Sequence, residues 1–338
     1  MSYSRSEARA WAQQNMKGIC GCLLPTFTGD LKHINERAVR HDIALTKRMG
    51  MSSTLVVAEC GTTFDELLQV TEVAIDEAGD ELQTVVHAAL PTLEDNIRLV
   101  RESERLGATY VLLSYPLTFY PATEQEVLDY TKAVAESTNL GVIVFGMHLW
   151  NFRRLHPSHF SPRLIGRMIE EIPNVVAVKT EIGGPGVGGI AEIFHRYHKD
   201  VIVMDPIESN SPAWHATYGM QWMGTSNYEA YGPWVARYFA LMRDGRFDEA
   251  MEIYWKIHPV READAAVVGP AINGTAMVHR YLWKYQGWLN GFNGGPMRAP
   301  LSRINDGQMA RLRAAAVAAG LDVTDSPDHE FLVGRNPA

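Results

Sequence analysis

Short apolar runs and amphipathic helical segments alternate eight times along this chain, between Gly18 and Arg243. Such alternation is typical of a parallel sheet whose strands are connected by helices. Eight strand–helix pairs in about 225 residues match the usual size of a closed barrel. We therefore predict an α/β fold, a (β/α)8 TIM barrel. An open doubly wound sheet is the alternative, but the first strand–helix turn lacks Gly-x-Gly-x-x-Gly.

Strands are expected at residues 18–24, 54–58, 83–88, 110–113, 141–145, 175–179, 201–204 and 222–225. Helices are expected at 35–49, 63–78, 93–106, 123–137, 162–171, up to 197, 211–218 and 232–243. Thr63 with Glu66, and Thr123 with Glu126, have the spacing of capping boxes. The five glycines between Gly183 and Gly189 lack the Lys-Ser/Thr of a phosphate loop, so we expect a flexible connection.

Beyond Asp244 the pattern is purely helical, with helices expected at 247–258, 276–288 and 306–319. We predict an N-terminal arm at 1–17, the barrel at 18–244, a C-terminal helical region at 245–322 and an irregular tail at 323–338.

Composition excludes several classes of protein. The net charge of −8 gives no electrostatic footprint for nucleic acid. No apolar stretch has the length of a membrane span or a signal core, so we expect a cytoplasmic protein without a membrane partner. The three cysteines, Cys20, Cys22 and Cys60, lack metal or redox spacing and are expected to be free thiols. The 12 histidines form no recognisable ligand pair, which disfavours a metal-dependent hydrolase, and we expect no metal or cofactor.

The run Val175–Val178 ends on Lys179. An ammonium at the tip of a buried strand loses hydration, which favours its neutral form. A neutral amine can attack a ketone and form a Schiff base. A lysine that snorkels out of the strand end is the alternative, and this segment alone leaves both open.

Other strand ends also carry chemistry, as expected where barrels place their active sites. After the second strand, Gly61 frees the backbone to approach a ligand, and Thr62 and Thr63 offer groups that favour a carboxylate at a helix N-terminus. Thr63 could equally be a plain helix cap. The eighth strand ends in Gly224 and Thr225, which we count as substrate-binding candidates.

Three motifs occur together: Gly61-Thr62-Thr63, a lysine that ends the sixth strand, and Gly-Gly-Pro-Met-Arg-Ala-Pro-Leu from Gly294. In their order and spacing, from about Lys17 to Leu321, the chain resembles the dihydrodipicolinate synthase and N-acetylneuraminate lyase family of class I aldolases. The resemblance implies a barrel with a helical C-terminal region, usually a homotetramer. It also implies that Lys179 forms a Schiff base with a 2-oxo acid whose carboxylate Thr62 and Thr63 hold.

The chain departs from this family on the fifth strand. The family usually has a tyrosine there that moves protons, whereas this chain has Phe145. His148 and Tyr120 are the local candidates for that task. His148 could be an ordinary loop histidine, and Tyr120 could match the family tyrosine that reaches into a neighbouring subunit's site.

A second departure concerns the substrate. Trp150 falls where synthases use an arginine for a second carboxylate, while Arg153 and Arg154 lie out of register. With Phe119 and Phe145 it suggests an apolar site for an aromatic partner, unless these rings only pack the loops.

The resemblance is strongest to the hydratase-aldolases that split benzylidenepyruvates, through Gly287-Trp288-Leu289 and Trp222, although that branch keeps the fifth-strand tyrosine. We predict a Schiff-base lyase acting on a pyruvate-derived 2-oxo acid and an apolar or aromatic aldehyde. The alternatives are a dehydratase of a deoxy sugar acid and a non-catalytic 2-oxo-acid-binding homologue.

Overall fold

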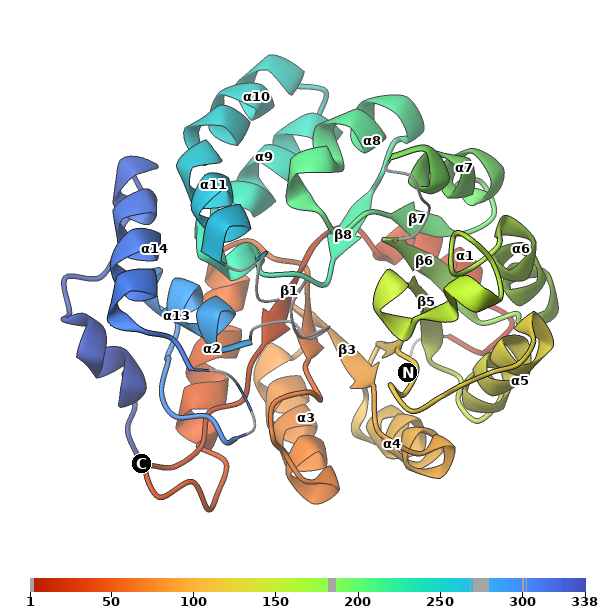
Figure 1. The fold of residues 1–338 in the computed structure, drawn as a ribbon, viewed down its shortest axis with the longest axis horizontal. Coiled ribbons are helices and arrows are strands. Elements are labelled where there is room, and N and C mark those ends of the chain that lie inside the picture. The colour runs from red at the N-terminus through yellow and green to blue at the C-terminus, as the bar shows by residue number, and fades with distance from the viewer. Residues whose placement is uncertain (1–2, 182–186, 268, 270–279, 300, 302) are drawn as a thin grey trace. The chain divides into compact units, whose positions relative to one another are not determined.

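A computed structural model describes residues 3–181, 187–267, 269, 280–299, 301 and 303–338. The chain divides into two compact units, whose helices and strands are labelled in Figure 1. Unit 1 comprises Met1–Lys17 and Gln83–Gly224, and unit 2 comprises Gly18–Leu82 and Thr225–Ala338. The domain boundaries proposed from the sequence stay a prediction.

The predicted alternation of strands and helices is confirmed. The strands are β1 (Gly18–Leu23), β2 (Ser53–Val56), β3 (Gln83–Ala88), β4 (Tyr110–Leu113), β5 (Gly141–Gly146), β6 (Val175–Thr180), β7 (Ile202–Met204) and β8 (Trp222–Gly224). They form one sheet in the order β7-β6-β5-β4-β3-β2-β1-β8, and the described pairs run parallel. This is the topology of a (β/α)8 barrel.

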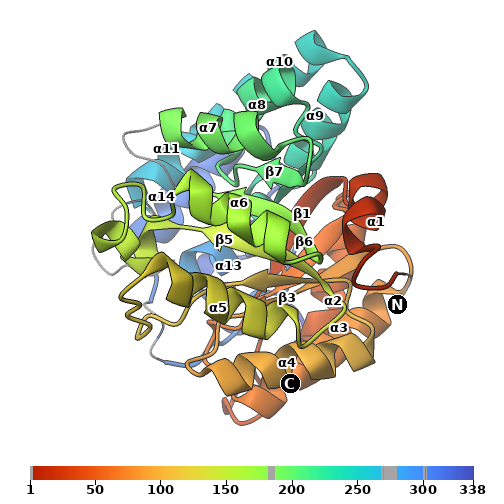
Figure 2. The same cartoon turned by 90° about the vertical axis from the view of Figure 1, so that its right-hand side faces the viewer.

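Unit 1 contains the helices α1 (Ala8–Asn15), α4 (Leu93–Leu106), α5 (Glu124–Ala135), α6 (Pro162–Glu171), α7 (Val187–Tyr197) and α8 (Ser211–Tyr218). Helices α4, α5 and α6 lie side by side (Figure 2). The N-terminal segment is docked through α1, because the Arg9 guanidinium donates to the carbonyls of Ile169 at 2.8 Å and Val175 at 3.1 Å. The predicted glycine connection lies mostly outside the described residues, and α7 begins within it, at Val187.

Unit 2 contains α2 (Glu36–Arg48), α3 (Phe64–Ala78), α9 (Trp234–Arg243), α10 (Phe247–Lys256), α11 (His258–Val267), α13 (Arg280–Leu289) and α14 (Asp306–Ala318). The helix predicted at 247–258 is confirmed as α10, which ends two residues earlier at Lys256, whereas α11, which begins at His258, was not predicted. Pro259 cannot donate a backbone hydrogen bond, so it is tolerated in the first turn of a new helix. The start of the helix predicted at 276–288 lies outside the described residues.

Five short 3-10 helices complete the described structure: η1 (His148–Trp150), η2 (Phe152–Arg154), η3 (Glu208–Asn210), η4 (Tyr228–Tyr231) and η5 (Asp328–Leu332). The last belongs to the tail, which packs onto unit 2 because Phe331 is fully buried and Arg335 donates to the Trp288 carbonyl at 2.9 Å. Across the described residues, no helix has the length and apolarity needed to cross a membrane.

The capping predictions had different outcomes. At α3, both bonds of the box are present: the Glu66 amide donates to Thr63 Oγ1 at 3.3 Å, and the Thr63 amide donates to Glu66 Oε2 at 2.9 Å. At α5, Thr123 caps the helix, but Glu126 accepts from the amide of Ala122 instead. Of the two predicted capping boxes, only the one at α3 is therefore reciprocal.

Candidate active site

Lys179 lies on β6, the strand that the apolar run predicted, and its side chain is buried. All six residues of β6 are buried, and Lys179 is only 4% exposed. Parallel pairing places Phe145 of β5 and Met204 of β7 beside it in register. The Lys179 side chain therefore does not snorkel to solvent, which removes the structural alternative raised by the sequence.

The Phe145 ring lies against this amine. Lys179 Nζ is 3.9 Å from the ring centroid, a cation–π contact when the amine is charged. Trp150 meets the same ring edge-on at 5.7 Å between centroids, and its Nε1 donates to the Phe145 carbonyl at 3.2 Å. The indole thus fixes the end of β5 that carries the ring.

An aromatic cluster continues from Trp150 through Tyr115, which follows β4. Tyr115 contacts Phe119 in a stacked arrangement at 6.0 Å and Phe152 edge-on at 5.5 Å. Its hydroxyl is 2.6 Å from Thr131 Oγ1, and burial raises its pKa. The Tyr115 phenol is therefore engaged within the cluster, and the predicted aromatic residues Phe119, Phe145 and Trp150 all belong to this part of unit 1.

The structure also brings to Lys179 a carboxylate to which sequence reasoning assigned no role. Glu181 Oε1 is 3.6 Å from Lys179 Nζ, and the Glu181 side chain is 19% exposed. The sequence contains one indication of this contact: Glu181 is two residues from Lys179, and residues two apart on an extended chain face the same way. Asp205 follows β7. Burial is the main cause that raises the pKa of its carboxyl group, and the negative charge of Glu181 adds a smaller increase.

The two candidates for proton transfer are exposed. Tyr120 is 76% exposed, and the Arg154 guanidinium stacks on its ring at 3.6 Å. His148 is exposed at the start of η1, with its ring 6.4 Å from that of His159. Their assignment as catalytic residues stays a prediction.

In unit 2, Gly61, Thr62 and Thr63 form the turn into α3. Gly61 has a φ of +76°, a left-handed conformation that favours glycine. Thr63 caps α3, as described above. The Thr62 hydroxyl is buried and has no hydrogen-bond partner among the described residues. An acceptor or donor supplied by a ligand would satisfy it.

Arg298 connects two motifs that are far apart in the sequence. Its guanidinium makes a bidentate ion pair with Glu66, at 2.6 and 2.7 Å, and contacts the Gly61 carbonyl at 3.4 Å. This ion pair is the main cause that lowers the pKa of Glu66; the Thr63 amide adds to the shift and burial opposes it. The C-terminal Gly-Gly-Pro-Met-Arg motif therefore positions the Gly61–Thr63 turn.

Helix α13 brings two cations to the ends of β1 and β2. Arg280 pairs with Glu59 at 2.6 Å, and Lys284 Nζ donates to the Pro25 carbonyl at 2.8 Å and to Thr26 Oγ1 at 2.7 Å. Burial lowers the pKa of Lys284 to about 8, while the charge of Asp42 opposes the shift. These contacts were not predicted, because no local pattern marks them.

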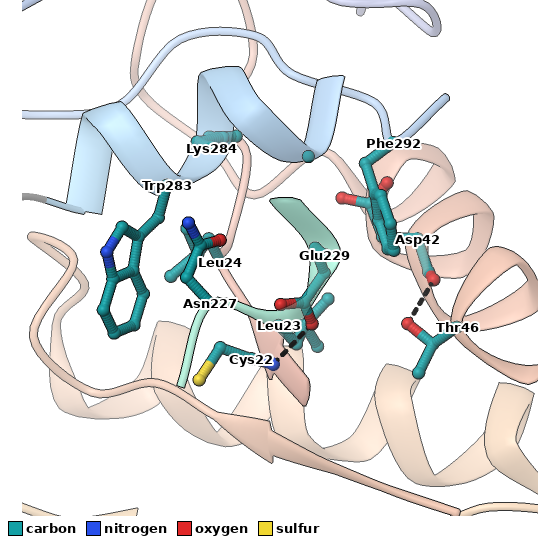
Figure 3. Close-up of a pocket in the computed structure, with 11 residues that line it drawn as sticks. Cys22, Leu23, Leu24, Asp42, Thr46, Asn227, Glu229, Trp283, Lys284 and Phe292 are labelled. Atoms are coloured by element: carbon teal, nitrogen blue, oxygen red, sulfur yellow. Dashed lines mark hydrogen bonds between the residues drawn. The ribbon is translucent and has the colours of Figure 1, made fainter. Parts of the chain in front are cut away.

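Lys284 lines a pocket of unit 2 with Asp42, Asn227, Glu229, Trp283 and Phe292 (Figure 3). Glu229 Oε1 accepts from the Cys22 amide at 2.6 Å, yet burial raises the pKa of Glu229 to about 8. The Asn293 amide donates to Asp42 at 2.6 Å, and burial raises the pKa of Asp42 to about 6. The pocket is therefore built around buried carboxyl groups.

The remaining predicted residues are placed as follows. Gly224 ends β8 and Thr225, 4% exposed, follows it. The three cysteines are buried and are not disulfide-bonded, and burial raises the pKa of the Cys60 thiol to about 12, which makes it a poor nucleophile. Within the described part of the chain, no cluster of three or more His, Cys, Asp or Glu could hold a metal ion.

Comparison with known proteins agrees with this architecture. The model of the dihydrodipicolinate synthetase family matches residues 15–316. A 4-hydroxy-tetrahydrodipicolinate synthase from Methanopyrus kandleri is 23% identical over 90% of this chain and 97% of its own length. An N-acetylneuraminate lyase from Pasteurella multocida is 24% identical over 86% and 94%.

Solved structures share the fold. A prophage protein of the dihydrodipicolinic acid synthase family from E. coli K12, solved in complex with pyruvate, superposes with a TM-score of 0.74 at 16% identity, covering 90% of this chain and 99% of its own. Membership supports a pyruvate-dependent lyase or synthase that works through a Schiff base. The chain belongs to the dihydrodipicolinate synthetase family.

Proposed function

We propose that this protein is a class I aldolase that cleaves or forms a bond between pyruvate and an apolar or aromatic aldehyde, with Lys179 as the Schiff-base residue. One observation carries the proposal: the Lys179 amine is 4% exposed at the end of β6, against the Phe145 ring. An amine in such surroundings is less favourably hydrated when charged, which helps it to act as a nucleophile.

Lys179 attacks the ketone carbon, and water leaves as the iminium forms. The iminium accepts electrons from the neighbouring carbon when the bond to the aldehyde carbon breaks. We assign the carboxylate of the 2-oxo acid to Thr62 and Thr63, following the family resemblance. The unpartnered Thr62 hydroxyl and the N-terminus of α3 are consistent with an anion there.

The apolar character of the partner is inferred from the rings around Lys179. Phe145, Trp150 and Phe119 belong to one chain of contacts through Tyr115. Rings favour an aromatic or apolar group over a second carboxylate. We assign the partner aldehyde to this side, and Gly224 and Thr225 to the substrate pocket.

Borohydride reduction in the presence of pyruvate tests the proposal. The expected result is a pyruvate-derived mass gain on the peptide that contains Lys179, and none in the variant Lys179→Arg. A wild-type protein that turns over substrate without a trapped adduct at Lys179 would refute it. Product analysis with benzylidenepyruvates and deoxy sugar acids then separates aldol cleavage from dehydration.

A further inference from the structure

Glu181 is held in a defined position next to Lys179. Its backbone amide donates to the Gly146 carbonyl at 2.8 Å, which ties the residue after β6 to the end of β5. Its side chain is 19% exposed, and Oε1 lies 3.6 Å from Lys179 Nζ. A carboxylate at this distance reaches protons on the amine, or on atoms bonded to it, after a small rotation or through one water.

The aromatic ring in contact with Lys179 supplies no proton acceptor. The Phe145 ring lies 3.9 Å from Nζ, and a phenyl group neither donates nor accepts a proton. The chemistry proposed above nevertheless requires protons to move at the amine, at the departing oxygen and at the carbon next to the imine.

Other acids near Lys179 are less suited to this task. Asp205 accepts hydrogen bonds from the Ile207 amide at 2.9 Å, Asn210 at 2.8 Å and the Trp214 indole at 2.7 Å. These three donors occupy both oxygens of the Asp205 carboxylate and fix its orientation. Tyr120 is largely exposed to solvent, and its ring is stacked against the Arg154 guanidinium.

We propose that Glu181 is a catalytic acid–base residue, which transfers protons at the Schiff base formed by Lys179. This inference rests on the proposed function. Glu181 takes a proton from the Lys179 ammonium, and the freed electron pair forms the Nζ–C2 bond to pyruvate while the C2=O π pair moves to oxygen. Glu181 returns this proton to that oxygen, and then carries a second proton from Nζ to the same oxygen. The C2–O bond breaks, the nitrogen lone pair forms the C=N bond, and water leaves.

The carboxylate then takes a proton from the methyl carbon of the pyruvate iminium. The C–H electron pair becomes the C=C bond of the enamine, and the C=N π pair moves to nitrogen. In the cleavage direction Glu181 instead takes the proton of the hydroxyl group whose oxygen becomes the aldehyde carbonyl, and the C–C electron pair forms the enamine. The enamine carbon then takes that proton from Glu181, and hydrolysis of the iminium releases pyruvate and the amine. Protons and electrons balance without a further reactant.

Exchange of the pyruvate methyl hydrogens in D2O, followed by NMR, tests this role alongside borohydride trapping. In Glu181→Gln we expect exchange to fall by at least about 100-fold while Lys179 is still trapped, since general acid–base groups contribute about 10²- to 10⁴-fold. Glu181→Asp should recover part of the exchange. Glu192→Gln is the matched control, because Glu192 lies on α7 in an exposed ion pair with Arg196.

The outcomes separate the two proposals. If Glu181→Gln exchanges at the wild-type rate, the role of Glu181 is refuted while the Schiff base stands. If the wild type is not trapped at Lys179, the proposed function is refuted and this inference with it. If Glu181→Gln fails to fold, Glu181→Asp tests the role instead. A Glu181→Asp variant that is trapped at Lys179 and exchanges the pyruvate methyl hydrogens at the wild-type rate, despite its shorter side chain, would also refute the role of Glu181.

Discussion

The two units each bury a lysine to the same extent, and the two lysines have different surroundings. Lys179 in unit 1 and Lys284 in unit 2 are both 4% exposed. Lys284 donates hydrogen bonds to two neutral oxygens at 2.8 and 2.7 Å, whereas Lys179 lies over a ring with a carboxylate 3.6 Å away. Burial alone therefore does not identify a reactive amine. We therefore expect the groups in contact with each amine to decide whether it acts as a structural lysine or as a nucleophile.

The largest expected effect is the loss of enzymatic turnover when Lys179, the first lysine of this comparison, is replaced. Replacing it with arginine keeps a positive charge but removes the nucleophile, so turnover should fall by at least about 10³-fold. The measurement is the steady-state rate with a benzylidenepyruvate. Lys199→Arg, on the exposed surface of unit 1, should leave the rate unchanged. Wild-type turnover in Lys179→Arg would contradict the proposed chemistry.

Lys284→Met should act on stability instead. It leaves the Pro25 carbonyl and Thr26 hydroxyl without this donor, and it removes the cation near Asp42, so we expect a loss of about 3 kcal/mol in the free energy of unfolding. Guanidinium denaturation measures it. Lys32→Met is the control, because that side chain is 74% exposed. An unchanged midpoint would show that Lys284 is not a structural lysine.

Arg298→Ala should destabilise unit 2 by about 2 kcal/mol, since the charged hydrogen bonds to Glu66 are partly buried. The Arg298 and Glu66 side chains are 21% and 16% exposed. The pair Arg246–Glu249 provides the comparison, because its side chains are 54% and 53% exposed, and Arg246→Ala should lower the stability much less than Arg298→Ala. Equal losses would show that burial of the pair is unimportant.

The buried carboxyl of Glu229 predicts a pH dependence of stability. Its pKa rises from an ordinary 4.5 to about 8, so the folded state binds more protons than the unfolded state between these values. The free energy of unfolding should therefore fall with rising pH across that window, by at most about 1.4 kcal/mol per pH unit for this group. Lys284, with its pKa lowered to about 8, acts in the opposite direction above pH 8.

Burial raises the pKa of Asp42 to about 6, so Asp42 contributes to the decrease in the free energy of unfolding only below about pH 6. The slope between pH 6 and 8 thus reports mainly on Glu229, and denaturation at several pH values measures it. Glu229→Gln should reduce the slope of the free energy of unfolding against pH between pH 6 and 8, whereas Glu249→Gln on the surface of α10 should leave this slope unchanged. An equally steep slope in Glu229→Gln would exclude Glu229 as the source.

The smallest expected effect concerns Gly61. Gly61 and Gly245 share a φ of +76°, so alanine is strained at both by about 1 kcal/mol. An added Cβ at Gly61 would lie 3.0 Å from Arg298 Cβ, whereas nothing lies within 4 Å at Gly245. Gly61→Ala should therefore cost about 1 kcal/mol more, measured by thermal unfolding. Equal costs would mean that the turn adjusts freely.

The sequence by itself determined the alternation of elements and the position of Lys179 at the end of a buried strand. Both follow from local pattern, because apolar periodicity and strand ends depend on neighbouring residues. The cap at Thr63 was predictable for the same reason. The sequence also showed that Phe145 replaces the expected phenol, although the consequence of that change could not be read from it.

Only the tertiary structure decided which side chains meet. Arg298 lies more than 200 residues from Glu66 in the sequence and still pairs with it. No period or motif spacing encodes such a contact, since it depends on the direction in which each side chain leaves its element. The same holds for Lys284 at the end of β1, whereas Glu181 is only two residues from Lys179 and its spacing offered a signal. Side-chain direction beyond the last residue of a strand is set by the loop, and the loop is set by the fold.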